Sequence, residues 1–233
     1  MSDPYFDQIQ GGLIVSCQAL EDEPLHGGDT MAKMALAAEQ GGAVGIRANS
    51  VHDIAAIKQV TRLPIIGIIK RDYPDSGVYI TPTLREVKEL MEVGVDVIAL
   101  DATPSPRPGG ETLEELVAYM KRSGQKVMAD ISTLAEAVQA ESLGVDCVST
   151  TLSGYTPYSP QQQEPDLALL QEAVGRIRIP VIGEGRINTP DQAAQCLKLG
   201  AHAVVVGSAI TRPKLITEKF ASAVRGTRGG QTR

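Results

Sequence analysis

The sequence predicts an α/β protein folded as a single closed (β/α)8 barrel, the TIM-barrel architecture, over residues 1–233. Three observations lead to this prediction. Short apolar runs alternate with longer segments of helical periodicity, the runs number eight, and a glycine-marked pattern recurs about every two of these units. Eight strand–helix units usually need about 250 residues, so a chain of 233 residues is long enough for a small member of this class.

The apolar runs are short and rich in Val and Ile, with little polar interruption. Strands that are buried on both faces of a parallel sheet have this composition. We therefore expect eight parallel strands, at residues 12–17, 43–47, 64–70, 96–101, 126–130, 146–150, 180–184 and 203–207.

The segments between the runs carry apolar residues at helical spacing, as in Leu84, Val87, Leu90 and Met91. Threonine precedes several of them at the position of an N-cap, and glycine follows several of them. The expected helices are residues 31–40, 84–93, 113–122, 134–143, 167–176 and 190–199, with a terminal helix at 214–225.

A glycine-led segment that ends a helix and opens a strand begins at residues 42, 94, 144 and 200, at intervals of 52, 50 and 56 residues. This period of about two units favours a barrel of repeated quarters. A doubly wound open sheet is the main alternative, but the even spacing and the absence of a linker favour closure. We expect residues 1–8 and the polar end 226–233 to be peripheral or frayed.

Composition excludes several function classes. The net charge of −6, the 3% of aromatic residues and the absence of Trp argue against a nucleic-acid partner. The N-terminal residues do not resemble a signal peptide, and no apolar stretch is long enough for a membrane span. Cys17, Cys147 and Cys196 are scattered, so we expect buried thiols in a reducing cytoplasm and neither a metal site nor a disulfide.

In a barrel of this kind, the chemistry lies at the carboxyl ends of the strands. Lys70 follows the apolar stretch 65–69, where desolvation would lower its pKa and suit it as a base or as a Schiff-base lysine. A structural ion pair with Glu184 or Asp130 is the alternative. Glu184, between two glycines, is the second candidate acid or base.

Glycines at the ends of the last two predicted strands indicate a phosphate site. Gly185 and Gly207, with Ser208, let backbone amides approach an anion closely. Arg212 either adds positive charge there or is an ordinary surface cation. Arg47 and Asp130 are candidates for orienting substrate hydroxyls, and Gln18 for holding an amide or carbonyl group.

Segments from about residue 9 to 224, among them PIIGIIKRDY, VIGEGRI and GAHAVVVGSAITRP, resemble the N-acetylmannosamine-6-phosphate 2-epimerase family. The resemblance implies a cytoplasmic enzyme of sialic-acid catabolism that interconverts N-acetylmannosamine 6-phosphate and N-acetylglucosamine 6-phosphate without a metal or nucleotide cofactor. It also implies that Lys70 is the catalytic lysine and Glu184 its acidic partner. Gln18, Arg47, Asp130 and Arg212 match other substrate-site positions.

Other functions stay open at this stage. A different phosphosugar isomerase would share the phosphate loops, a Schiff-base lyase would use Lys70 covalently, and a regulator would bind a sugar phosphate without catalysis. Lys70 and Glu184 at one mouth favour an enzyme. A phosphosugar is the expected small-molecule partner, and a homodimer is expected because barrels often pair through their helices.

Overall fold

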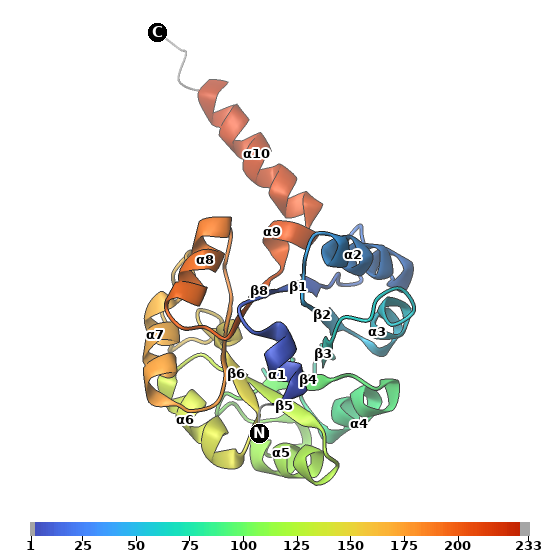
Figure 1. Ribbon diagram of the computed structural model, residues 1–233, viewed down its shortest axis with the longest axis vertical. Helices are drawn as coiled ribbons and strands as arrows, with labels where there is room; N and C mark the ends of the chain where they lie inside the picture. The colour runs from blue at the N-terminus through green and yellow to red at the C-terminus, as the bar shows by residue number, and fades with distance from the viewer. Residues whose placement is uncertain (1–2, 229–233) are drawn as a thin grey trace.

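The computed structural model describes residues 3–228 and contains the predicted closed barrel. Its eight strands are parallel, pair in chain order, and close through β1 and β8, with helices around the ring (Figure 1). The strands are β1 (Leu13–Cys17), β2 (Gly45–Asn49), β3 (Ile65–Ile68), β4 (Val97–Asp101), β5 (Lys126–Asp130), β6 (Cys147–Ser149), β7 (Val181–Glu184) and β8 (Ala203–Val206).

The longer helices coincide with the predicted segments to within a few residues. They are α2 (Gly28–Gln40), α4 (Leu84–Val93), α5 (Leu113–Arg122), α6 (Leu134–Leu143), α7 (Leu167–Arg176), α8 (Pro190–Lys198) and α10 (Pro213–Arg228). Four of the threonines that precede these segments cap their helices and form reciprocal capping boxes, namely Thr83, Thr112, Thr133 and Thr189.

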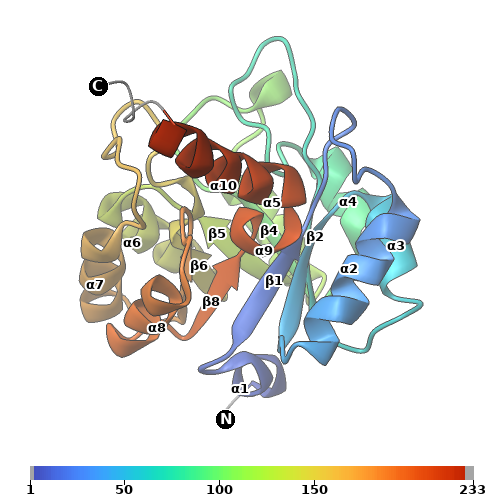
Figure 2. The same ribbon diagram turned by 90° about the horizontal axis from the view of Figure 1, so that it is seen from above.

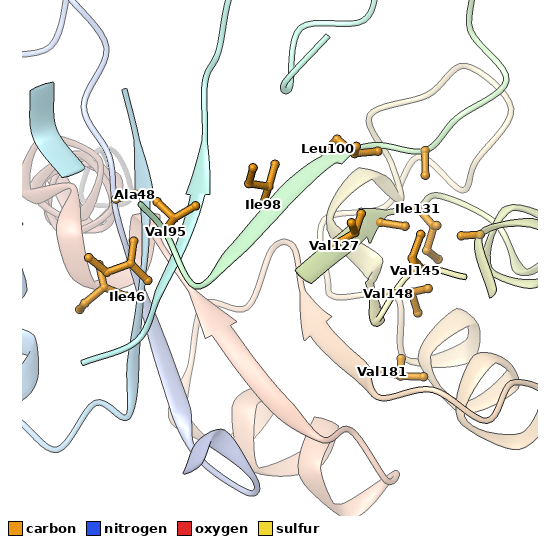
Figure 3. Packing of buried hydrophobic residues seen from close by; sticks show 14 of the residues in the cluster. Ile46, Ala48, Val95, Ile98, Leu100, Val127, Ile131, Val145, Val148 and Val181 are labelled. Carbon is orange, nitrogen blue, oxygen red and sulfur yellow. The ribbon is translucent and has the colours of Figure 1, made fainter. Parts of the chain in front are cut away.

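Alternation along the strands divides the buried side chains between two clusters. An inner cluster fills the barrel and includes Met128 of β5 and Ile182 of β7. An outer cluster lies between strands and helices and includes Ile46, Ala48 and Val181 (Figure 3). Since side chains two residues apart share a face, Arg47 between Ile46 and Ala48 must point inward, as must Glu184 after Ile182. The side chains that point into the barrel therefore change from apolar to polar toward the carboxyl ends of the strands.

The N-terminal residues correct one prediction. Residues 1–8 were expected to be peripheral, yet α1 (Pro4–Ile9) buries Tyr5, Phe6 and Ile9 within the inner cluster. Figure 2 shows α1 at the end of the barrel where the strands begin. The apolar residues of this single turn and a half close the bottom of the barrel, and six residues are too few to show helical periodicity in the sequence.

Two further short helices and two 3₁₀ turns of the described chain lie outside the predicted segments. The helices are α3 (Val51–Ile57) and α9 (Ser208–Thr211), and the turns are η1 (Pro108–Gly110) and η2 (Thr150–Leu152). Of the predicted frayed end 226–233, residues 226–228 continue α10, and 229–233 lie outside the described residues.

The first and last parts of the barrel meet at its mouth. β1 pairs with β8, and the Thr211 hydroxyl of α9 donates to the Ser16 carbonyl at 2.8 Å. Helix α10 then extends beyond the ring of helices (Figure 1), at the end of the barrel opposite α1 (Figure 2).

Candidate active site

A cavity of about 1270 Å³ opens at the carboxyl ends of the strands. It brings together eight of the nine residues predicted for the site, although they come from both ends and the middle of the chain. These are Gln18, Arg47, Lys70, Glu184, Gly185, Gly207, Ser208 and Arg212. Asp130 is the exception, because it is fully buried and is not among the residues that line the cavity.

Lys70 lies two residues beyond β3, where its backbone N–H donates to the Asn49 side chain at 2.8 Å. Its pKa is lowered from 10.5 to about 8 by burial and by the positive charges of Arg47 and Arg212, against the opposing effects of Glu184 and Glu23. Within the described part of the chain its ammonium makes no ion pair or hydrogen bond. The alternative of a structural ion pair with Glu184 or Asp130 is therefore wrong.

Glu184 is held at one of its two carboxylate oxygens. Oε2 accepts from Arg47 Nη1 at 2.8 Å, from the Thr151 hydroxyl at 3.0 Å and from the Ser149 hydroxyl at 3.2 Å. Burial raises the pKa of this carboxyl group, and the Arg47 charge acts in the opposite direction. The side chain stays 12% exposed, so the carboxylate remains in contact with the cavity.

Arg47 is a buried bridge between two carboxylates. Its Nη1 and Nη2 donate to Oδ1 and Oδ2 of Asp130 at 3.0 and 2.6 Å, and Nη1 also donates to Glu184. Burial alone would lower the Arg47 pKa, but Asp130 and Glu184 raise it above its ordinary value. We expected Asp130 to orient a substrate hydroxyl, whereas here it orients Arg47 from behind the cavity wall.

Three buried polar atoms of cavity-lining residues lack a hydrogen-bond partner among the described residues, namely Gln18 Oε1, Arg47 Nε and Arg186 Nε. Gln18 donates to the Ser16 hydroxyl at 2.8 Å, which leaves its Oε1 as an unpaired acceptor. Arg47 Nε is an unpaired donor. Buried polar groups are usually paired, so an acceptor and a donor left open beside a cavity indicate positions for the polar groups of a ligand.

The predicted phosphate loops lie side by side on β7 and β8. Gly185 has a φ of +103°, a conformation that suits glycine. Gly207 is the N-cap residue of α9, and because it is a glycine, it has no side chain to cap the backbone amides of the first turn. Arg212 lines the same cavity, but its guanidinium pairs with Glu23 at 3.0 Å. The end of the cavity near β7 and β8 thus combines glycine backbone, which a ligand can approach closely, with the positive charge of Arg212.

Several functional contacts escaped the sequence prediction. Ser149 and Thr151 bind Glu184, Asn49 fixes the backbone of Lys70, and Glu23 holds Arg212. Arg186 lines the cavity over the Tyr155 ring, 5.8 Å from its centroid. Ser149 lies two residues after the inward Cys147 on β6, so period-two alternation was the signal that could have identified it. Thr151 was recognised as a strand-end residue, but its contact with Glu184 was not predicted.

The three cysteines are buried, as predicted, and their thiols are free. Residues 3–228 contain no group of three or more His, Cys, Asp or Glu side chains arranged to hold a metal ion. In the same range, no helix has the length and apolar character that crossing a bilayer requires.

Comparison with known proteins identifies relatives along nearly the whole chain. The family model "Putative N-acetylmannosamine-6-phosphate epimerase" matches residues 31–226. A Clostridioides difficile protein named "Putative N-acetylmannosamine-6-phosphate 2-epimerase" is 58% identical over 218 residues, covering 94% of this chain and 98% of that protein. A Clostridium perfringens protein of the same name is 59% identical over 214 residues, covering 92% and 97%.

Solved structures give the same result. The N-acetylmannosamine-6-phosphate 2-epimerase from Clostridium perfringens has a TM-score of 0.93 and 56% identity, covering 96% of this chain and 97% of that one. The thiamine phosphate pyrophosphorylase from Pyrococcus furiosus has a TM-score of 0.60, 20% identity, and coverage of 95% and 98%, and it shares the fold alone. By the family match, the identity and the coverage, the chain belongs to the N-acetylmannosamine-6-phosphate 2-epimerase family.

Proposed function

We propose that the protein inverts C2 of N-acetylmannosamine 6-phosphate to give N-acetylglucosamine 6-phosphate, as a step in the catabolism of sialic acid and related amino sugars. The family membership supports the reaction. The observation that carries it in this chain is the state of Lys70. This lysine has a pKa of about 8, has no anionic partner in the described residues and shares a cavity with Glu184.

Removal of the C2 proton requires a base and a stabilised carbanion. In the open-chain sugar, C1 is an aldehyde, so the charge left at C2 delocalises onto the C1 oxygen as an enolate. A lysine with a pKa near 8 is partly neutral at physiological pH, and its free amine can accept the proton. Lys70 is therefore the base that removes the C2 proton in the proposed reaction. Inversion requires the proton to return on the opposite face of C2, from a second group, from Lys70 after the intermediate has rotated, or through a sugar hydroxyl that relays it.

Groups around Lys70 stabilise the developing enolate charge and hold the acetamido group of the substrate. The unpaired Arg47 Nε is a donor for the developing enolate oxygen. The unpaired Gln18 Oε1 is an acceptor for the N–H of the acetamido group. Glu184 assists by moving a proton during ring opening or by tuning Lys70, whose pKa it keeps from falling further. Asp130 contributes by holding Arg47 in place.

The phosphate group anchors the other end of the substrate. We assign it to the backbone of Gly185, Gly207 and Ser208, with Arg212 as the cation. Binding energy from a part of the molecule that does not react can hold C2 against Lys70 while the bonds at C1 and C2 rearrange.

Proton NMR of the purified protein tests this proposal. N-acetylmannosamine 6-phosphate should convert to N-acetylglucosamine 6-phosphate, and in deuterated water the C2 proton should exchange for deuterium. Lys70→Ala should lose both the conversion and the exchange. Wild-type exchange in that variant would exclude Lys70 as the base, and failure of the wild-type protein to convert the substrate would refute the function.

The lowered pKa of Lys70 also favours a second candidate, a lyase that forms a Schiff base, because a neutral amine attacks a carbonyl carbon. Borohydride added with substrate would then reduce the imine and leave the sugar covalently attached to Lys70. The epimerase predicts no such adduct, so mass spectrometry of the treated protein separates the two reactions.

We also propose that the enzyme works in the cytoplasm as a homodimer. Buried thiols that stay unpaired are typical of a reducing compartment. Helix α10 extends beyond the ring (Figure 1), and its Phe220 side chain is 71% exposed. Light scattering should give the mass of two chains, and Phe220→Ser should shift it toward one. A wild-type mass of one chain would refute the dimer.

A further inference from the structure

The hydroxyl of Thr151 lies between the two carboxylates of the site. Thr151 is in the turn that follows β6 and lines the cavity. Its Oγ1 is 2.8 Å from Asp130 Oδ1 and 3.0 Å from Glu184 Oε2. A hydroxyl has one hydrogen and can donate it to only one acceptor at a time. Donation to Glu184 therefore excludes donation to Asp130.

The other donors in this group are not divided in the same way. Arg47 Nη1 carries two hydrogens and can donate to both carboxylates at once, at 3.0 Å to Asp130 and 2.8 Å to Glu184, and its Nη2 donates to Asp130. The Ser149 hydroxyl is 3.2 Å from Glu184 Oε2 and 2.8 Å from Thr151 Oγ1. Thr151 is therefore the hydroxyl that reaches both carboxylates with a single hydrogen to donate.

Glu184 is asymmetric in a way that fits this competition. In the described part of the chain, all hydrogen bonds to its carboxylate go to Oε2. Oε1 is left on the cavity side, where a proton can be exchanged with substrate or solvent. A hydrogen bond at Oε2 stabilises the charged form of the whole carboxylate, so the Thr151 hydroxyl influences how readily Oε1 takes a proton.

We propose that Thr151 is a positioning residue that switches one hydrogen bond between Glu184 and Asp130 as Glu184 loses and gains its proton. When Glu184 is ionised, Thr151 donates to it. When Oε1 is protonated, Oε2 is a weaker acceptor and the hydroxyl turns to Asp130 Oδ1. The switch needs only rotation of an O–H bond.

The surroundings of Glu184 make such a small change effective. Arg47 of β2 and Lys70 after β3 favour its ionised form, whereas Asp130 of β5 opposes it. Tyr79, on the cavity wall, also feels the charges of Asp130 and Arg47. With attraction and repulsion opposed in a buried site, a single donor shifts the balance more than it would in water.

Carbon-13 NMR of protein labelled at the glutamate side-chain carboxyl measures the titration of Glu184 directly, with Glu184→Gln identifying its signal. Thr151→Val keeps the shape but removes the hydroxyl, and should raise the apparent pKa of Glu184 by about one unit. Thr151→Ser keeps the hydroxyl and should leave the titration as in wild type. An unchanged titration in Thr151→Val overturns the proposal.

Two further measurements keep the result interpretable. Backbone amide spectra check that Thr151→Val is folded, and Thr151→Ala provides a second variant without the hydroxyl. The role of the switch in catalysis rests on the proposed function, for which Thr151→Val should lower kcat about tenfold with little change in KM, while Thr151→Ser keeps most of the activity. If the titration shifts but the wild-type protein does not epimerise the substrate, the hydrogen-bond switch stands and the proposed function fails.

Discussion

Arg212, the cation assigned to the substrate phosphate, is bound to Glu23: its Nη2 lies 3.0 Å from the Glu23 carboxylate. Glu23 lies in the loop after β1, and Arg212 follows α9 near the other end of the chain. The two side chains are 26% and 22% exposed, so water screens the pair only partly. A carboxylate therefore neutralises Arg212 before any phosphate arrives.

The first prediction is that Glu23→Gln strengthens phosphate binding. Loss of the competing charge should lower the dissociation constant for inorganic phosphate about threefold, because a partly exposed ion pair contributes up to about 1 kcal/mol. Titration calorimetry measures this, with Glu21→Gln as a control in the same loop. Weaker binding in Glu23→Gln would mean that Glu23 orients Arg212 and does not compete for it.

The second prediction concerns the stability cost of Lys70. Its pKa is about 8 in the folded protein against 10.5 for an ordinary lysine, so the unfolded chain binds more protons between these values and stability rises with pH across that window. Below pH 8 the lysine is charged in both the folded and the unfolded state, so the full free-energy cost of burying its charge is present. Lys70→Met should therefore raise the free energy of unfolding at pH 7 by about 2 kcal/mol, with a smaller gain at pH 9.5.

Urea unfolding at the two pH values measures this effect. The control is Lys33→Met on the exposed face of α2, which should change the free energy of unfolding by less than about 0.5 kcal/mol. A loss of stability in Lys70→Met at pH 7 would show that the lysine is better accommodated than its burial implies.

The third prediction is that Arg47→Leu strongly destabilises the fold. Asp130 and Glu184 would remain buried without their cation, which typically costs about 3–5 kcal/mol. Without Arg47, the pKa of Glu184, already raised by burial, rises further, so part of the lost stability should return as the pH falls and this carboxyl group becomes protonated. Thermal unfolding at pH 7 and pH 5 checks this, and a deficit that is the same at both pH values would contradict it.

The fourth prediction concerns Gly185. Its φ of +103° is rarely adopted by residues with a side chain, although a Cβ there would meet the Thr150 and Thr151 carbonyls at an ordinary 3.5 Å. Gly185→Ala should cost about 1–3 kcal/mol from backbone strain and lower kcat by displacing Glu184. Gly175→Ala in α7 is the matched control, because it has open space and should be neutral or slightly stabilising. Equal effects in the two variants would exclude the strain argument.

The sequence was sufficient for the barrel because its signals are local. The apolar runs, the threonine caps and the helix-ending glycines each depend on neighbouring residues, and β1–β8 lie close to the predicted ranges. Helices α1 and α3 were missed because six and seven residues are too few for a periodic pattern. The burial of Tyr5 and Phe6 depends on a barrel end that forms only in three dimensions.

The sequence predicted which residues line the cavity, with the exception of Asp130, but not the contacts that they make. Because chemistry in such barrels lies at the strand ends, the sequence predicted that Lys70 and Glu184 share one cavity, and both residues line it. The pairing of Arg47 with Asp130 depends on how far each side chain reaches across the barrel, and this distance has no local signature. The Glu23–Arg212 contact joins residues that are distant in the chain, so neither sequence segment indicates the other.

The contact between Thr211 and Ser16 joins residues 195 positions apart. During synthesis on the ribosome, strand β1 emerges first but has to wait for β8 and α9 before its second edge is paired. No shorter nascent chain can have the complete end of the cavity to which we assign the phosphate, so the proposed substrate cannot assist folding until the last strand has left the exit tunnel.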